Sequence, residues 1–116
     1  MIEMKLDSIY YEYIVEGLKD YELRIYDEKR QKIKLFDSIK FINRKNKRTF
    51  KAVVTGLTFY QNFEEAIGDT GVESLLPNVK SEKKGVEIYN SFPHGEGGTY
   101  KEAAEKYGVL RIKFDV

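Results

Sequence analysis

The sequence predicts an α+β fold, built as a small β-barrel of about five to six strands with helices inserted between them. Three observations support this class. Segments in which apolar and polar residues alternate, as in half-buried strands, occur in both halves of the chain. Segments with helical spacing, opened by capping residues, separate them. The length of 116 residues suits one domain, so we expect residues 1–116 to form a single one.

The first predicted elements are a short strand and a helix. Residues 4–6 form the strand, and Asp7 can cap the helix, which Gly17 ends. Apolar residues at spacings of three and four predict the buried face of this helix: Ile9, Tyr10, Tyr13 and Ile14.

Three more strands are predicted before the middle of the chain. Residues 21–26 alternate as in a half-buried strand, and residues 39–43 continue with the same period. Residues 43–47 form a hairpin tip, and the β-branched and aromatic segment 49–60 forms a long strand with a bulge or bend at Gly56.

The second half alternates helices with short loops. Asn62, Ser81 and Thr99 each open a predicted helix, and a glutamate three residues after Asn62 and after Thr99 completes a capping-box pattern. The second of these helices runs to about Phe92, and Gly108 ends the third. The remaining elements are a turn at residues 75–77, a flexible Gly-rich loop at 93–98 and a last strand at 109–116.

Composition excludes several classes of site. The chain has no cysteine, which rules out disulfides, thiolate metal sites and cysteine nucleophiles, and its single histidine, His94, leaves no multi-histidine metal site. We therefore expect no metal and no cofactor. No apolar stretch is long enough to cross a bilayer, and the mixed charges of Glu3, Lys5 and Asp7 do not resemble a signal peptide. A cytoplasmic protein without a membrane partner is expected, and the oligomeric state is left open.

Charge is distributed unevenly although the formal net charge is only +1. Residues 28–51 contain ten basic and two acidic residues, whereas both flanking segments are acidic overall. A basic segment of this kind favours a polyanionic partner, most simply nucleic acid. The alternative is a solvated hairpin whose lysines keep it soluble and protect an edge strand.

Four segments together resemble one known family. Residues 17–24, GLKDYELR, fit the pattern G-x-K-x-x-E-x-R of the ASCH domain family, named for its homology to activating signal cointegrator 1. Residues 32–41, 59–76 and 107–114 resemble that family's strand entry, its helix segment ending in Leu-Leu-Pro and its terminal strand, in the same order. The resemblance covers nearly the whole chain and implies a PUA-like β-barrel, whose relatives commonly bind RNA.

One position departs from the family pattern. The family usually has Gly-Asp where this chain has Phe36 and Asp37. If the first position lies in a turn that needs positive φ, phenylalanine strains it, and we expect the local turn to differ from that of the family.

The motif itself suggests a ligand site. Glu22 and Arg24 lie on one face of the predicted strand, and Lys19 lies just before it. The two cations can bind a phosphate or carboxylate while Glu22 accepts from a base or sugar. The structural alternative is a Glu22–Arg24 ion pair at the barrel mouth, with Lys19 solvated.

Two function classes follow from these observations. The first is an RNA-binding module, which the sequence does not separate from a third possibility, a domain that binds a small nucleoside-like or anionic ligand in the same cleft. The second is an enzyme, since some relatives resemble amidohydrolases that act on N4-acetylcytidine through a lysine and a threonine of this motif and a later glutamate. Lys19 and Glu22 would then be catalytic, with Glu82 the nearest candidate for the later glutamate, but Glu22 replaces the threonine and the hydroxyl nucleophile is missing. A nuclease is a weaker variant of this reading.

Further binding candidates lie outside the motif. Among the tyrosines, Tyr11 and Tyr26 are predicted to point outward and could stack on bases. The basic residues at the predicted hairpin tip are candidates for phosphate contacts: Lys45, Lys47 and Arg48. His94, in the Gly-rich loop, has no partner at triad or metal spacing and is expected to be exposed; its role is left open.

Overall fold

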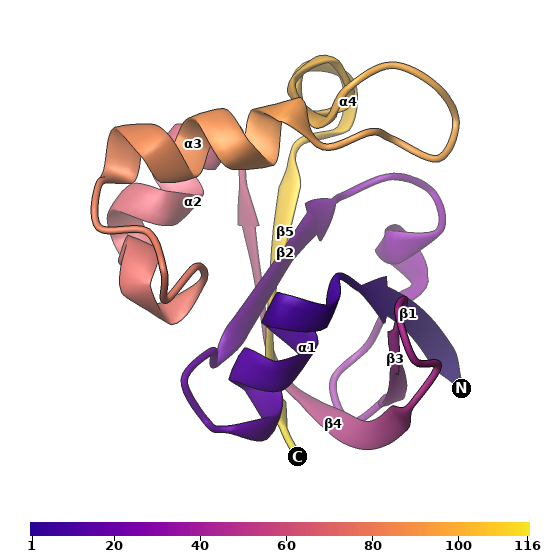
Figure 1. Ribbon diagram of the computed structural model, residues 1–116. Helices are drawn as coiled ribbons and strands as arrows, with labels where there is room; N and C mark the ends of the chain where they lie inside the picture. Colours follow the sequence, from indigo (N-terminus) through magenta and orange to yellow (C-terminus); the bar gives the residue numbers. More distant parts are fainter.

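A computed structural model describes residues 1–116 and contains five strands in one curled, mixed sheet, with four helices (Figure 1). The strands are β1 (Ile2–Leu6), β2 (Tyr21–Ile25), β3 (Ser38–Asn43), β4 (Thr49–Tyr60) and β5 (Val109–Asp115). The helices are α1 (Ser8–Val15), α2 (Phe63–Thr70), α3 (Glu82–Ser91) and α4 (Tyr100–Tyr107), and two short 3₁₀ turns span Arg30–Lys32 and Val72–Ser74. The expected α+β class is confirmed, and the sheet forms a half-barrel.

The sheet leaves the motif strand at one edge. Its order is β1-β3-β4-β5-β2, in which β1 and β3 are parallel and all other neighbours are antiparallel. The strand β2 therefore pairs with β5 alone. The expected irregularity at Gly56 is present as a register shift between Val54 and Gly56, which lets the long β4 bend and pair with β3 at one end and with β5 at the other.

Two hydrophobic clusters fill the molecule. One lies between β2 and the helices α2, α3 and α4, which gather at one end of the sheet in Figure 1; Leu23 and Ile25 of β2 belong to it. The other lies between α1 and the curled part of the sheet, where Phe41 packs against Phe50 and Phe114. The alternation of β2 thus sends its apolar side chains into the first cluster and its charged side chains the other way.

Helix boundaries follow the predicted caps. The side chains of Asn62, Ser81 and Thr99 each accept a hydrogen bond from a backbone N–H three residues later, and Thr99 forms the full capping box with Glu102. The capping box predicted at Asn62 is not completed, because the Glu65 carboxylate accepts from the Gln61 N–H instead. Asp7 also lies at the N-cap position of α1, but its side chain makes no capping bond. Its carboxylate lies 3.5 Å from the Arg44 guanidinium instead.

The predicted buried face of α1 is wrong by about one residue. Tyr11 and Ile14 are buried, whereas Ile9 is exposed and Tyr10 and Tyr13 are only half-buried. Six of the eight helix residues are apolar or aromatic, so the spacing alone could not distinguish two faces 100° apart. Packing against the sheet selects the face of Tyr11, whose ring contacts that of Phe50 on β4 at 5.0 Å between centroids.

The strain expected at Phe36 is present. Its φ is +70°, in the left-handed region, and its side chain is 78% exposed. Hydrogen bonds hold the backbone on both sides of this residue: the Phe36 N–H donates to the Val54 carbonyl, and the Lys34 N–H donates to the Asp37 carboxylate. A turn that suits glycine is therefore formed by a strained, solvent-facing phenylalanine.

Candidate functional site

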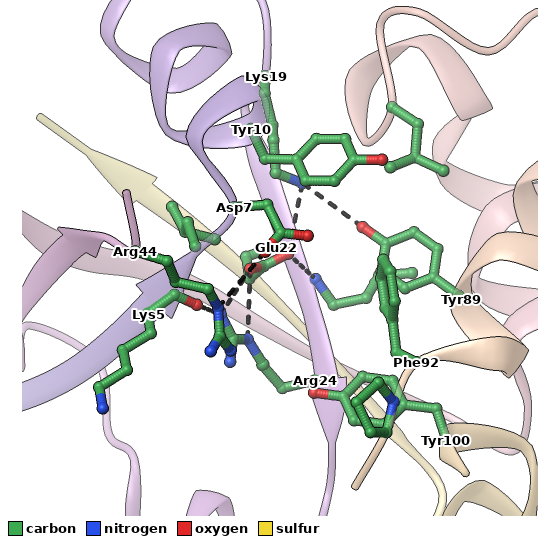
Figure 2. A pocket seen from close by; sticks show the side chains of 14 residues that line it. Lys5, Asp7, Tyr10, Lys19, Glu22, Arg24, Arg44, Tyr89, Phe92 and Tyr100 are labelled. Atoms are coloured by element: carbon green, nitrogen blue, oxygen red, sulfur yellow. Dashed lines mark hydrogen bonds and ion pairs between the residues drawn. The ribbon is translucent and has the colours of Figure 1, made fainter. Parts of the chain in front are cut away.

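A cleft of about 370 Å³ opens between the two edge strands of the half-barrel, β1 and β2, with α1 and α3 beside it. Its size is within the range of small-molecule sites. Figure 2 shows charged side chains meeting at its centre and aromatic rings along one wall. The lining residues are Lys5, Leu6, Asp7, Tyr10, Lys19, Glu22, Leu23, Arg24, Arg44, Leu76, Tyr89, Phe92, Pro93 and Tyr100.

The three charged residues of the motif meet at the centre of this cleft. The Lys19 ammonium lies 3.3 Å from one carboxylate oxygen of Glu22, and the Arg24 guanidinium lies 2.9 Å from the other. All three residues are buried, with exposures of 2%, 5% and 9% for Lys19, Glu22 and Arg24. The structural alternative is therefore right about the Glu22–Arg24 ion pair and wrong about Lys19, which is not solvated.

The Lys19 ammonium is fully engaged. It donates to the Tyr21 carbonyl at 2.7 Å and the Leu75 carbonyl at 2.8 Å, faces Glu22, and lies 3.5 Å from the Tyr89 hydroxyl. Burial lowers the pKa of Lys19, and the neighbouring Glu22 carboxylate partly offsets this. Two carbonyls and a carboxylate can only accept hydrogen bonds, so this set of partners requires the three donors of an ammonium. Lys19 therefore adds positive charge to the cleft without a free donor.

Arg24 joins the two open edges of the sheet. Its Nη2 donates to Glu22 and also to the Lys5 carbonyl of β1 at 2.9 Å, while its Nε donates to Glu22 at 3.3 Å. Burial lowers the pKa of a guanidinium, but Glu22 outweighs it and the pKa of Arg24 is raised, so the charge is permanent. None of the hydrogen bonds of the protein uses its Nη1.

The Glu22 carboxylate has no free acceptor position. One oxygen accepts from the Leu23 N–H at 3.1 Å and faces Lys19, and the other accepts twice from Arg24. Burial by itself would raise the pKa of Glu22, but Lys19 and Arg24 outweigh it and hold the pKa below its usual value. The expected role of Glu22 as an acceptor for a base or sugar would require one of these four bonds to open.

An aromatic wall borders the charged cluster. Tyr10, Tyr89, Phe92 and Tyr100 all line the cleft. The Phe92 ring meets the Tyr89 and Tyr100 rings edge to face, at 5.4 and 5.8 Å between centroids. Burial raises the pKa of Tyr89 well above its usual value, so its hydroxyl stays neutral. Sequence reasoning missed this wall, because a capped amphipathic helix gives no sign of which of its aromatic residues border a cavity.

The two tyrosines predicted to stack on bases lie elsewhere. Tyr11 is buried in the cluster beneath α1 and does not line the cleft. Tyr26 is half-buried and meets the Phe59 ring edge to face at 5.3 Å, outside the cleft. Both expectations assumed simple helix and strand faces, and tertiary packing overrode them.

The predicted hairpin tip lies beside the cleft mouth. Lys45, Lys47 and Arg48 are all exposed on the β3–β4 turn, and the preceding Arg44 lines the cleft. Asn43 fixes this turn, since its amide donates to Ser8 and its side-chain oxygen accepts from the Lys45 N–H. Arg44 therefore lies between the exposed cations of the tip and the buried cations of the cleft.

The expectation for His94 is wrong. Its side chain is buried, and its Nε2 lies 3.0 Å from the Asp27 carboxylate, which also accepts from the backbone and side chain of Arg30. Burial disfavours the charged form of Asp27, but its hydrogen bonds, led by that with His94, lower its pKa below the usual value. The Gly-rich loop is thus anchored through His94, its one buried residue. A partner 67 residues away leaves no spacing signal in the sequence.

The last candidate residue, Glu82, finds no support as the later glutamate of an enzyme site. It is exposed in the first turn of α3 and does not line the cleft. No group of three or more histidine, aspartate or glutamate side chains is placed to hold a metal ion. None of the helices has both the length and the apolar character needed to span a membrane.

Comparisons with known proteins agree with this fold. The family model described as the ASCH domain matches residues 4–116. The chain is similar to the crystal structure of hypothetical protein PH0355, with 39% identity, a TM-score of 0.81 and coverage of 97% of this chain and 95% of that one. It is also similar to the solution NMR structure of protein PF0455 from Pyrococcus furiosus, with 35% identity, a TM-score of 0.74 and coverage of 98% and 94%. No curated protein sequence matches the chain.

Proposed function

This chain belongs to the ASCH domain family, which is PUA-like and associated with RNA, and we propose that it binds single-stranded RNA with one nucleotide in the cleft and the flanking phosphates on the β3–β4 tip. Unstacked bases of single strands can enter a cleft of this size, whereas bases inside a duplex cannot.

The observation that carries the proposal is the continuity of positive charge from the tip into the cleft. Lys45, Lys47 and Arg48 are exposed, Arg44 stands at the mouth, and Arg24 lies inside. Exposed cations attract the RNA backbone without regard to sequence, and their effect is lost as salt rises. The aromatic wall beside Arg24 offers rings on which a base can stack.

The same geometry favours binding over hydrolysis. The pKa of Glu22 is held low by two cations, which makes the carboxylate a weak base, and Lys19 has no free donor or lone pair. The hydroxyl in contact with Lys19 belongs to Tyr89, whose raised pKa makes it a poor nucleophile. We therefore place the amidohydrolase and nuclease alternatives second.

Charge reversal at the tip tests the proposal. A labelled single-stranded RNA is titrated at several salt concentrations with the unaltered protein and with the triple variant Lys45→Glu, Lys47→Glu, Arg48→Glu. If each residue contacts one phosphate, the variant binds more weakly and its log–log salt slope is smaller by about two, since each contact on a single strand contributes roughly 0.7.

A matched control separates the tip from overall charge. Lys80, Lys83 and Lys84 are equally exposed and lie outside the cleft, so reversing these three changes the net charge by the same amount. We expect the control to keep most of the affinity and slope. Equal losses in both variants, or no loss in the tip variant, would overturn the proposal.

A further inference from the structure

The buried cluster of the cleft carries a surplus of positive charge. Lys19 and Arg24 contribute two positive charges and Glu22 one negative charge, and none of the three is more than 9% exposed. The only other acid that lines the cleft is Asp7, which is exposed and faces Arg44 at 3.5 Å. The buried cluster thus keeps one positive charge without a buried counter-charge, an arrangement that is costly unless a ligand supplies the missing negative charge.

The hydrogen bonds show why neither cation can lose its charge cheaply. Lys19 must donate three times, to the carbonyls of Tyr21 and Leu75 and to Glu22. A neutral amine has only two N–H donors, so deprotonation would leave one buried acceptor unsatisfied. Arg24 stays protonated at any ordinary pH.

The unfilled position in this network is a donor. The four acceptor positions of Glu22 are taken, whereas Nη1 of Arg24 takes part in no hydrogen bond of the protein. A ligand group that completes the network must therefore accept a hydrogen bond and carry negative charge. A neutral base edge satisfies only the first of these conditions.

We propose that the part of the cleft around Arg24 is an anion subsite that takes a phosphate monoester of a nucleotide, held by Nη1 of Arg24 and favoured by the surplus charge that Lys19 supplies. The choice of a nucleotide rests on the proposed function. The rings of Phe92 and Tyr100 line the cleft together with Arg24, where a nucleoside attached to the phosphate would lie. The phosphate can be that of a free mononucleotide or of an RNA chain end.

Removing the phosphate from the ligand tests this directly. The four nucleosides are compared with their 5′- and 3′-monophosphates by calorimetric titration, and short single-stranded RNAs are compared with and without a terminal phosphate. We expect the phosphate to raise affinity at least about tenfold, the effect of one charge-assisted hydrogen bond. A gain with the mononucleotides alone identifies a free nucleotide, and a gain with the oligonucleotides also identifies a chain end. Equal affinities throughout would overturn the proposal.

Two substitutions test the role of the surplus charge. Lys19→Met removes a buried charge whose three N–H donors are all used within the protein. Lys5→Met removes an exposed charge from the same cleft. The gain is measured within each variant as the ratio of nucleotide to nucleoside affinity. We expect Lys19→Met to abolish most of this gain and Lys5→Met to keep most of it, because solvent screens the charge of Lys5. A full gain in Lys19→Met would refute the role of Lys19. The comparison of ligands on the unaltered protein decides about the subsite even if Lys19→Met folds poorly.

The two proposals can fail separately. RNA binding with the expected salt slope but no phosphate gain rejects the subsite and keeps the proposed function. A phosphate gain with mononucleotides, in a protein whose tip variant binds RNA unchanged, supports the subsite and rejects the RNA-binding role of the tip.

Discussion

Replacing Glu22 by glutamine should destabilise the protein far more than the same substitution at an exposed glutamate. The substitution keeps the shape of the side chain but removes the one negative charge between Lys19 and Arg24, and it turns one acceptor oxygen into a donor. Breaking a buried ion pair by removing one partner costs about 3–5 kcal/mol, because the remaining charge is buried and unpaired. We expect a loss in this range, since Glu22 is 5% exposed and faces both cations within 3.3 Å.

Urea denaturation measures this loss. For a transition slope of about 2 kcal/mol per M, the midpoint should fall by roughly 2 M with little change in slope. Glu12→Gln is the matched control, because Glu12 is exposed on α1 and forms no ion pair; its midpoint should hardly move. A loss below about 1 kcal/mol for Glu22→Gln would place the cluster with ordinary surface pairs and refute the reasoning about its burial.

The pH dependence gives an independent check. Because the pKa of Glu22 is lowered in the folded protein, its contribution to stability is fully present above the unfolded value of about 4.5 and is lost as pH falls through the folded value. The unaltered protein should therefore lose stability in acid more steeply than Glu22→Gln. Parallel acid profiles would show that the carboxylate is not held ionised by its neighbours.

Two further substitutions test features outside the cleft. Phe36→Gly should raise the unfolding free energy by about 0.5–1 kcal/mol. Glycine removes the strain of the left-handed backbone, worth roughly 1–2 kcal/mol, and this exceeds the cost of its extra freedom in the unfolded chain. A lower melting temperature would instead assign the exposed ring a stabilising contact. Asp27→Asn should cost about 1–3 kcal/mol at pH 7, since it weakens the bonds to His94 and Arg30. The Asp27 pKa is lowered in the folded state, so this cost should shrink as pH falls below about 4. Denaturation of both proteins at several pH values measures the cost, and a cost that does not change with pH would contradict the reasoning.

Local chemistry predicted most of the framework. The caps at Asn62, Ser81 and Thr99 form as expected, because a capping bond joins residues only three apart and needs no tertiary information. The shift at Gly56 and the strained turn at Phe36 were likewise predictable from single residues whose backbone preferences are strong.

The cleft was predictable only in part. The motif identified Lys19, Glu22 and Arg24, but its spacing could not show that all three are buried or that Arg24 reaches the Lys5 carbonyl of another strand. The same limit applies to Tyr89 and Tyr100, which reach the cleft from helices at the far end of the chain. Such contacts depend on how elements pack, and sequence spacing carries no record of that.

The pairing of β2 with β5 also has a consequence for the order of folding. The strand that carries Glu22 and Arg24 has its only strand neighbour far along the chain, and Glu22 pairs with Ile112, ninety positions later. Closing so long a loop is entropically costly and slow, and pairing must wait until β5 has been synthesised. The parallel pair β1 and β3 and the hairpin of β3 and β4 can form well before that. The cleft is therefore among the last parts of the molecule to become ordered, and a nascent chain that lacks β5 has the basic tip but no formed ligand site.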